Sequence, residues 1–248
     1  MKKKRKKSKW LETFTRGANR MTRLEVFDYY NNPVVSEKIT DEIKRNRAIV
    51  IQKFEDKYIL RRHHNNKWIR IKKPSGDKPS SLDYWARRHL LEVHKVIGPK
   101  TDEVIIDIDP NNVKLQSVKG VIRLISDKLE SIYNKKPEVI YSGGRGFYVR
   151  VKLDSPQHVN KIRKTLKEEV VKPLVKRKGF LVDRKPKKGE IRIDLSPMKS
   201  GGSYRVPYSI NGKTGLTAVP VDPKDIRLFH PGNAIPQFVM IDLARRAR

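Results

Sequence analysis

Apolar positions along this chain recur with two spacings, which together predict helices alternating with strands. Helices are expected at 21–43 with a break at Asn31-Asn32-Pro33, from Ser81 through Val93, at 118–132, and from Ser155 through about Val171. Strands rich in β-branched residues are expected at 48–54, 57–62, 67–72, 104–109, 139–141, 147–153 and 191–195. This alternation is typical of an α/β (α+β) protein with a mixed central sheet flanked by helices.

The two ends of the chain differ from this pattern. Residues 1–9 read MKKKRKKSK, and residues 1–20 are expected to form a flexible basic arm. The last ordered region is expected at 204–221, with turns at Asn211-Gly212 and Thr214-Gly215. Neither an internal repeat nor a linker divides the remainder, so residues 21–248 are expected to form one domain.

Charge changes this picture more than any other property. Lysine and arginine number 57 against 27 acidic residues, which gives a formal net charge of +30 and indicates a polyanionic partner, most often nucleic acid. The chain contains no cysteine, which excludes disulfides and thiolate zinc sites. No apolar run approaches the ~18 residues of a membrane-spanning helix, and no signal-peptide pattern follows the basic N-terminus. We therefore expect an intracellular protein that binds DNA or RNA and no membrane.

The strand expected at 104–109 carries two aspartates, Asp107 and Asp109, just before Pro110. Residues two apart in a strand face the same side, so both carboxylates project together from an apolar strand. Such a pair is destabilising unless a cation lies between its members, and Mg²⁺ or Mn²⁺ prefers oxygen ligands of this kind. In the alternative interpretation, one aspartate caps a turn and the other faces water at the sheet edge.

A glycine-rich loop, Ser142-Gly143-Gly144-Arg145-Gly146, joins the strands expected at 139–141 and 147–153. Glycines let backbone amides approach an anion, and Arg145 adds a charge-assisted hydrogen-bond donor for a phosphate. Taken alone, a Gly-Gly pair between strands is more often a simple turn.

Two later segments carry further candidate chemistry. Asp194 is a third acid on an apolar strand and could complete a metal site with the first two. Asp183 is its rival, although two neighbouring cations indicate an exposed ion pair there. The segment from Arg205 to Gly215 sets two cations, two aliphatic hydroxyls and an amide along a tight loop, which by itself could be a decorated hairpin.

In their order along the chain, these motifs resemble those of the archaeo-eukaryotic primase superfamily. That superfamily includes the small catalytic subunit of archaeal and eukaryotic primases and the polymerase domain of bacterial end-joining ligases. Its Asp-x-Asp strand matches 104–109, its Ser-Gly-x-Arg-Gly loop matches 142–149, and its hydrophobic-Asp pair matches Ile193-Asp194. Its later basic, Pro-x-Ser and Lys-Thr-Gly elements match Arg205, Pro207, Ser209 and 213–215, and Asp28-Tyr29-Tyr30 looks like the start of primase small subunits. The resemblance covers about residues 21–221.

The resemblance implies a single primase-polymerase catalytic core. Such a core is a template-dependent nucleotidyltransferase that extends DNA or RNA from nucleoside triphosphates, as a DNA primase, a primase-polymerase or an end-joining gap-filling polymerase. The implied catalytic residues, which would also hold two Mg²⁺ or Mn²⁺ ions, are Asp107, Asp109 and Asp194. The implied nucleotide-binding residues are Ser142, Gly143, Gly144, Arg145, Tyr148, Arg205, Asn211 and Lys213. No zinc is expected, since the zinc-bearing insertion of many primase small subunits is missing.

The implied partners are a DNA or RNA template-primer, nucleoside triphosphates, and a primase large subunit or another replication or repair protein. Template contacts are expected from the basic segment 48–72 and from the N-terminal arm. If the source is archaeal, the protein is expected in the cytoplasm or nucleoid.

Two positions depart from the family pattern. Tyr148 and Asn211 stand where the family usually has histidine, and neither can carry a positive charge. These replacements favour an alternative, a non-catalytic primase-like subunit that binds nucleic acid, whereas the three retained aspartates favour catalysis. A nuclease is a third hypothesis, disfavoured by the cationic loop. Strand alternation predicts that Phe147 is buried and that Tyr148 faces the same side as the aspartates.

Overall fold

The computed structural model describes residues 21–44, 46–55, 57–73 and 80–246. The described part of the chain begins with helices α2 (Arg23–Asn31) and α3 (Pro33–Ile43), separated at the predicted break. Thr22 and Glu25 form a capping box at the start of α2, and the Asn32 side chain accepts hydrogen bonds from the first amides of α3. One asparagine thus ends the first helix and caps the second.

The first sheet contains four antiparallel strands in the order β11-β5-β1-β2. Its strands are β1 (Ala48–Phe54), β2 (Lys57–Arg61), β5 (Leu90–Val96) and β11 (Ser203–Arg205). The β1–β2 hairpin confirms one sequence prediction. The strand predicted at 67–72 is wrong, because only β4 (Lys67–Trp68) forms there, paired with β3 (His63–His64) in a separate small ribbon.

The helix predicted from Ser81 is also wrong beyond its first turns. Helix α4 (Ser81–Ala86) ends early, and His89 adopts a positive φ of 61°. Leu90 then begins β5, which crosses the centre of the first sheet. The left-handed residue reverses the chain, so the leucines that suggested a continuing helix lie on a buried strand instead.

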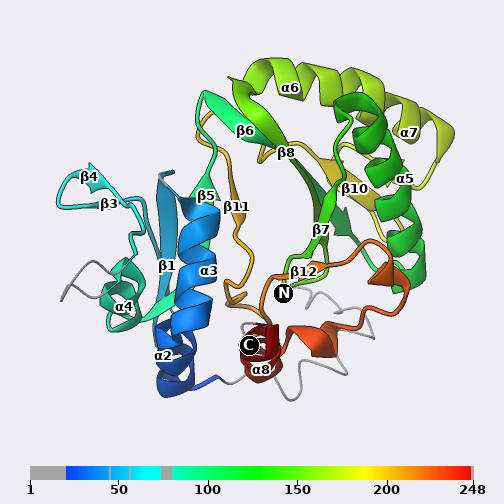
Figure 1. Ribbon diagram of the computed structural model, residues 1–248. Coiled ribbons are helices and arrows are strands. Elements are labelled where there is room, and N and C mark those ends of the chain that lie inside the picture. Colours follow the sequence, from blue (N-terminus) through cyan, green and yellow to red (C-terminus); the bar gives the residue numbers. More distant parts are fainter. Residues whose placement is uncertain (1–20, 45, 56, 74–79, 247–248) are drawn as a thin grey trace, which may run out of the picture.

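The second sheet contains six strands in the order β12-β7-β8-β6-β10-β9. They are β6 (Lys100–Pro110), β7 (Glu138–Tyr141), β8 (Phe147–His158), β9 (Leu181–Val182), β10 (Ile191–Asp194) and β12 (Val219–Val221). The β9–β10 pair is parallel and the other pairs are antiparallel, so this sheet is mixed. The α/β fold class is confirmed, with the strands divided between two main sheets and the small β3–β4 ribbon (Figure 1).

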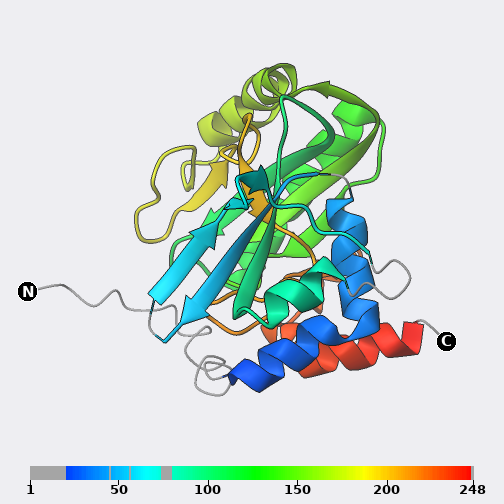
Figure 2. The same cartoon turned by 90° about the vertical axis from the view of Figure 1, so that its left-hand side faces the viewer.

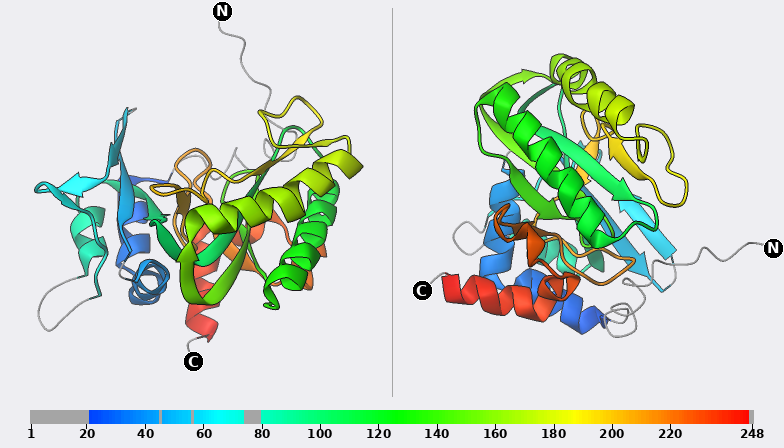
Figure 3. Two further views of the ribbon diagram at one scale, coloured as in Figure 1. Left: turned by 90° about the horizontal axis from the view of Figure 1, so that it is seen from above. Right: turned by 90° about the vertical axis from the view of Figure 1, so that its right-hand side faces the viewer.

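Helices cover the outer side of the second sheet, away from the first (Figures 1 and 3). They are α5 (Leu115–Tyr133), α6 (Val159–Thr165), the π-helical segment η1 (Leu166–Val171) and α7 (Lys172–Arg177). The helix predicted from Ser155 starts later than expected, because β8 continues to His158 by pairing with the start of β6. It also ends later, at Arg177.

The chain does not end its ordered part at Val221, as the sequence had suggested. Short 3₁₀ turns η2 (Asp225–Arg227) and η3 (Pro231–Ala234) lead into α8 (Pro236–Arg246). Helix α8 returns beside α2 and α3 (Figure 2), so the two ends of the described chain close one side of the first sheet. Among the described residues, no helix is long and apolar enough to cross a membrane.

A buried ionic network joins the two sheets. Arg150 on β8 is 1% exposed and bonds Glu42 from α3, Glu138 from β7 and the hydroxyl of Tyr204 from β11. Beside it, the Lys95 ammonium of β5 lies 2.9 Å from Glu103 of β6. Because the partners come from both sheets, this network fixes how one sheet sits on the other.

Candidate active site

The three predicted aspartates come from two adjacent strands of the second sheet. Asp107 and Asp109 occupy alternate positions near the end of β6, and Asp194 is the last residue of β10. In the antiparallel register, Asp194 pairs directly with Asp107. Directly opposed residues in such a pair face the same side with Cβ atoms about 4.5–5.5 Å apart. The fold therefore gathers these three carboxylates on one face of the sheet.

The proximity of the other two carboxylates affects the pKa of Asp107. Burial, followed by the charges of Asp109 and Asp194, raises the pKa of the Asp107 carboxyl from 3.8 to about 7. A half-buried carboxyl that is this reluctant to ionise marks a place where a cation would be strongly favoured.

The other two aspartates are engaged by protein groups. Arg145 forms a bidentate ion pair with Asp109, at 2.7 and 3.0 Å. Asp194 accepts from the backbone amide and hydroxyl of Ser196 and lies 2.9 Å from a guanidinium nitrogen of Arg192. In this arrangement, no three Asp, Glu or His side chains of the described chain converge closely enough to hold a metal ion. The donor set itself, three carboxylates with one raised pKa, fits a hard divalent cation.

The glycine-rich loop lies against the end of β6. Gly143 has a φ of +72°, and a Cβ there would lie 2.8 Å from the Leu216 carbonyl oxygen. At Gly146, a Cβ would collide with the carbonyl oxygen of Ile108, next to Asp109. Both positions therefore require glycine, since any side chain would force the loop away from the aspartates.

The third motif packs onto this loop. The Thr214 hydroxyl donates a 2.5 Å hydrogen bond to the Gly143 carbonyl, and Asn211 is buried beside Gly144. Ser142 is buried and its hydroxyl accepts weakly from the Gly144 amide, at 3.4 Å. Lys213 differs from the others, because it is exposed at the tip of the loop.

Arg205 links the two sheets at the site. It lies on β11, donates to the Ser142 carbonyl at 2.8 Å, and pairs with the Glu92 carboxylate at 2.5 Å. Its Nε is buried without a hydrogen-bond partner. A buried, unsatisfied guanidinium nitrogen close to a phosphate-type loop is a candidate donor for an anionic ligand.

Glu92 and His94 belong to the site but escaped sequence analysis. His94 pairs with Arg205 across β5 and β11, and its Nε2 lies 2.9 Å from Glu92. Burial alone would raise the pKa of Glu92, but the hydrogen bond to His94 and the charge of Arg205 lower it to about 2. Burial lowers the pKa of the His94 imidazole, and Arg205 adds to this. The alternating Glu-x-His was a usable signal, hidden because this segment was interpreted as helix.

Tyr148 lies where strand alternation predicts. It pairs with Asp107 across β8 and β6, whereas Phe147 is fully buried on the opposite face. Burial and the nearby Asp107 charge raise the pKa of the Tyr148 hydroxyl, which is held by a hydrogen bond to the Arg205 backbone. The Tyr148 ring packs edge-on against Tyr204, with centroids 5.7 Å apart.

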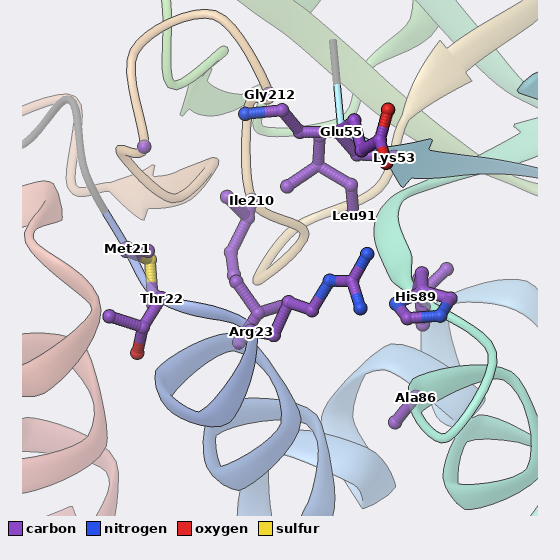
Figure 4. A pocket seen from close by; sticks show the side chains of 13 residues that line it. Met21, Thr22, Arg23, Lys53, Glu55, Ala86, His89, Leu91, Ile210 and Gly212 are labelled. Carbon is purple, nitrogen blue, oxygen red and sulfur yellow. The ribbon is translucent and has the colours of Figure 1, made fainter. Parts of the chain in front are cut away.

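A pocket opens beside the third motif, between the start of α2 and the ends of β1 and β5. Figure 4 shows Arg23 extending into it toward His89, with Lys53 and Glu55 on the far side and Gly212 at its edge. Burial and the charge of Arg23 lower the pKa of His89. The pocket thus places two cationic side chains next to the predicted nucleotide loop.

The fold is that of a polymerase domain. The structure of the polymerase domain from Mycobacterium tuberculosis Ligase D in complex with DNA superimposes with a TM-score of 0.76 at 18% identity, over 97% of this chain and 95% of that one. A family model described as LigD, primase-polymerase domain, matches residues 22–246. The chain therefore belongs to the LigD primase-polymerase domain family, within the archaeo-eukaryotic primase superfamily.

One curated relative agrees with this assignment. An uncharacterized DNA primase small subunit-like protein from Archaeoglobus fulgidus is 26% identical over 170 residues, which cover 59% of this chain. The match covers 54% of the relative, so the chain spans about half the length of the protein it resembles.

Proposed function

We propose that this protein is a template-dependent nucleotidyltransferase that extends DNA or RNA from nucleoside triphosphates. The observation that carries the proposal is the register of Asp107 with Asp194, which gathers three carboxylates beside the glycine-rich loop. Membership in a family of nucleotidyltransferase domains supports the same reaction class.

Asp107, Asp109 and Asp194 would hold Mg²⁺ or Mn²⁺. Bound divalent ions supply charge that favours ionisation of the attacking 3′-hydroxyl and stabilises the leaving pyrophosphate. Asp109 is now paired with the Arg145 guanidinium, and this cation could exchange Asp109 for a triphosphate oxygen. The raised pKa of Asp107 falls when a cation is near, so that this carboxylate is then ionised.

The triphosphate would lie against the glycine-rich loop and Arg205. Ser142, Gly143, Gly144 and Arg145 provide a hydroxyl, backbone amides and a guanidinium, and Arg205 brings its unsatisfied Nε. His94 lies beside Arg205 and is a further donor. The remaining residues proposed for the nucleotide are Tyr148, Asn211 and the exposed Lys213.

Nucleic acid is the partner that the charge and the family favour. The net charge of +30 suits a polyanion, and the structurally similar polymerase domain was solved with DNA. We place template contacts on the segment 48–72, with the arm at residues 1–20 lying outside the described residues. A replication or repair partner protein and an intracellular location remain part of this proposal.

Among the alternatives, end-joining gap filling is favoured by the match to the LigD domain. A non-catalytic subunit is favoured by Tyr148 and Asn211 at the two departing positions. It is disfavoured by the preserved register of the aspartates and by His94, which offers a titratable donor in the same cluster.

Primer extension tests the proposal directly. The purified protein, Mn²⁺, labelled nucleotides, and primer–templates with a 5′ overhang or a gap should give labelled, template-coded products. Asp107→Asn, which removes one charge and nearly no volume, should give none while binding DNA as before. Absence of extension on every substrate, with DNA binding intact, would establish the non-catalytic alternative.

A further inference from the structure

A second surface suited to nucleic acid lies on the outer side of the first sheet. The β3–β4 ribbon projects from this sheet and packs beside α4, on the side away from β6 and β10 (Figure 1). A groove of about 620 Å³ separates the ribbon from the helix, within the range of pockets that enclose small molecules. It is thus separate from the aspartate site.

The residues that line the groove carry charge of one sign only. Four of its lining residues are cations, Arg47, Lys67, Arg70 and Lys72, and none of the described lining residues is acidic. A groove lined by one sign of charge focuses its field and concentrates a polyanion.

Aromatic rings line the same groove. Trp68 of the ribbon and Tyr84 of α4 are half-buried, with part of each side chain open to solvent. The Arg47 guanidinium lies 4.8 Å from the Trp68 ring centroid, and the Arg88 guanidinium lies 3.7 Å from that of Tyr84. Such cation–aromatic stacks hold both planar groups in place, and rings and guanidinium planes are the surfaces on which unpaired bases stack.

The ribbon itself is held firmly. His64 contacts both Tyr84 and Trp85, and its Nε2 lies 3.0 Å from the Tyr84 hydroxyl. Ile69, next to Trp68, is buried and hydrogen-bonds to both Arg62 and Ala48. The aromatic platform is therefore preformed, which reduces the entropy lost when a flexible strand binds.

From this combination we propose that the groove between the β3–β4 ribbon and α4 binds unpaired nucleic acid by stacking bases on Trp68 and Tyr84. Charge alone would suit duplex as well, but duplex hides its base faces, whereas single strands expose them to aromatic platforms. An acidic peptide would leave the paired aromatics without a role. Identification of the bound strand as template overhang rests on the proposed function; binding itself does not.

Binding is measured by fluorescence anisotropy with an oligothymidylate of about 16 nucleotides, the upper end of known single-strand site sizes. EDTA is present and nucleotides are absent, so catalysis plays no part. Tyr84→Leu should weaken binding at least about fivefold, the lower limit for losing one stacked base. Binding of a duplex of equal length should change less than twofold.

Two matched double variants distinguish binding in this groove from non-specific attraction to the overall positive charge. Lys67→Ser with Lys72→Ser should flatten the slope of log affinity against log salt by about 1.4, as expected for two single-strand phosphate contacts. Lys161→Ser with Lys164→Ser removes the same charge from the exposed face of α6 on the other sheet and should leave that slope unchanged.

Tryptophan fluorescence supplies an independent readout. Saturating oligothymidylate should quench the protein, and Trp68→Phe, which keeps an aromatic ring in the fold, should remove most of this quenching. Equal effects of the two lysine pairs, or binding without any quenching, would overturn the proposal, as would tighter binding of duplex than of single strand. Asp107→Asn should bind oligothymidylate normally. Failed extension by the parent protein, with a working groove, would contradict only the polymerase assignment.

Discussion

Tyr148 and Asp107 face each other directly across strands β8 and β6, so a phenol stands opposite the most strongly perturbed carboxyl of the site. The Tyr148 hydroxyl reaches the backbone of Arg205 on the other sheet. Tyr148 therefore connects the aspartate cluster to Arg205, the cation that would bind a triphosphate.

The first prediction concerns the contact between the Tyr148 hydroxyl and Arg205. Tyr148→Phe keeps the ring against Tyr204 and removes one neutral hydrogen bond, worth about 1 kcal/mol. The KM for nucleotide should rise about fivefold with little change in kcat, as measured by steady-state extension. Tyr133→Phe is the control, because the Tyr133 hydroxyl is buried without a hydrogen-bond partner. If both variants behave alike, the Tyr148 hydroxyl has no role in holding Arg205.

A second prediction distinguishes the third carboxylate from its rival. Asp194→Asn should abolish extension, because Asp194 faces Asp107. Asp183→Asn removes an equal charge from an exposed position and should leave extension within about twofold of the parent. Both variants should bind DNA at least as well as the parent, since each removes negative charge near a polyanion. An active Asp194→Asn protein would contradict the assignment.

Stability should depend on pH through Asp107. The folded-state pKa of about 7 lies above the ordinary value of 3.8, so between these values the folded protein binds a proton that the unfolded chain does not. By linkage, this contribution to the free energy of unfolding is present at low pH and is lost as pH rises through about 7.

The measurement compares metal-free parent and Asp107→Asn by urea unfolding from about pH 4 to about pH 8. The variant should be similar to the parent at the acid end and more stable by several kcal/mol at the alkaline end, because each pKa unit corresponds to about 1.4 kcal/mol. A constant difference across this range would show that the Asp107 carboxyl is not perturbed. Adding Mg²⁺ should stabilise the parent more at the alkaline end than at the acid end.

Removing Arg150 should damage the fold more than the chemistry. Arg150→Met leaves Glu42, Glu103 and Glu138 without their common partner, and breaking a buried ion pair costs about 3–5 kcal/mol. Lys152→Met is the control, since this half-exposed ammonium lies 3.4 and 3.8 Å from two of the same carboxylates. Its loss should cost less than about 1 kcal/mol in urea unfolding. Equal losses would mean that the network is not centred on Arg150.

The N-terminal block gives a fifth prediction. Deleting residues 1–9 removes seven lysine or arginine side chains. If these side chains bind phosphates, the slope of log affinity against log salt should become shallower by about 0.7–0.9 for each phosphate that is no longer neutralised. An unchanged slope in DNA-binding titrations would show that the block does not touch the nucleic acid.

Sequence reasoning succeeded where local pattern and final structure agree. The run around Asp107 is β-branched and apolar, so its strand and the shared face of its two aspartates were predictable. The same reasoning failed for Leu90–Val96, because α4 ends at Ala86 and the left-handed residue His89 redirects the chain into β5. The spacing of the apolar residues gives no sign of this change. It also failed at Ser155-Pro156, where pairing with a distant strand overrides a good helix-start signal.

The residues of the site were likewise predicted only in part. Motif order located the carboxylates and the glycine loop, but not the ion pairs that engage them. Arg145 with Asp109, and Arg205 with Glu92, are pairs between segments far apart in the chain, so only the folded structure reveals them. His94 was missed because its segment was interpreted as helix, and its position opposite Arg205 depends on strand pairing.

Strand β11 is synthesised after most of the second sheet, and this order affects folding during translation. Glu92 and Arg205 lie 113 positions apart, and the strand that brings them together leaves the ribosome only after most of the second sheet. Until then, the edge of β5 is unpaired and the carboxylate of Glu92 has no guanidinium. A truncated product ending before residue 203 would therefore expose a strand edge that invites aggregation. We expect nascent chains of this protein to depend on chaperones until Arg205 emerges.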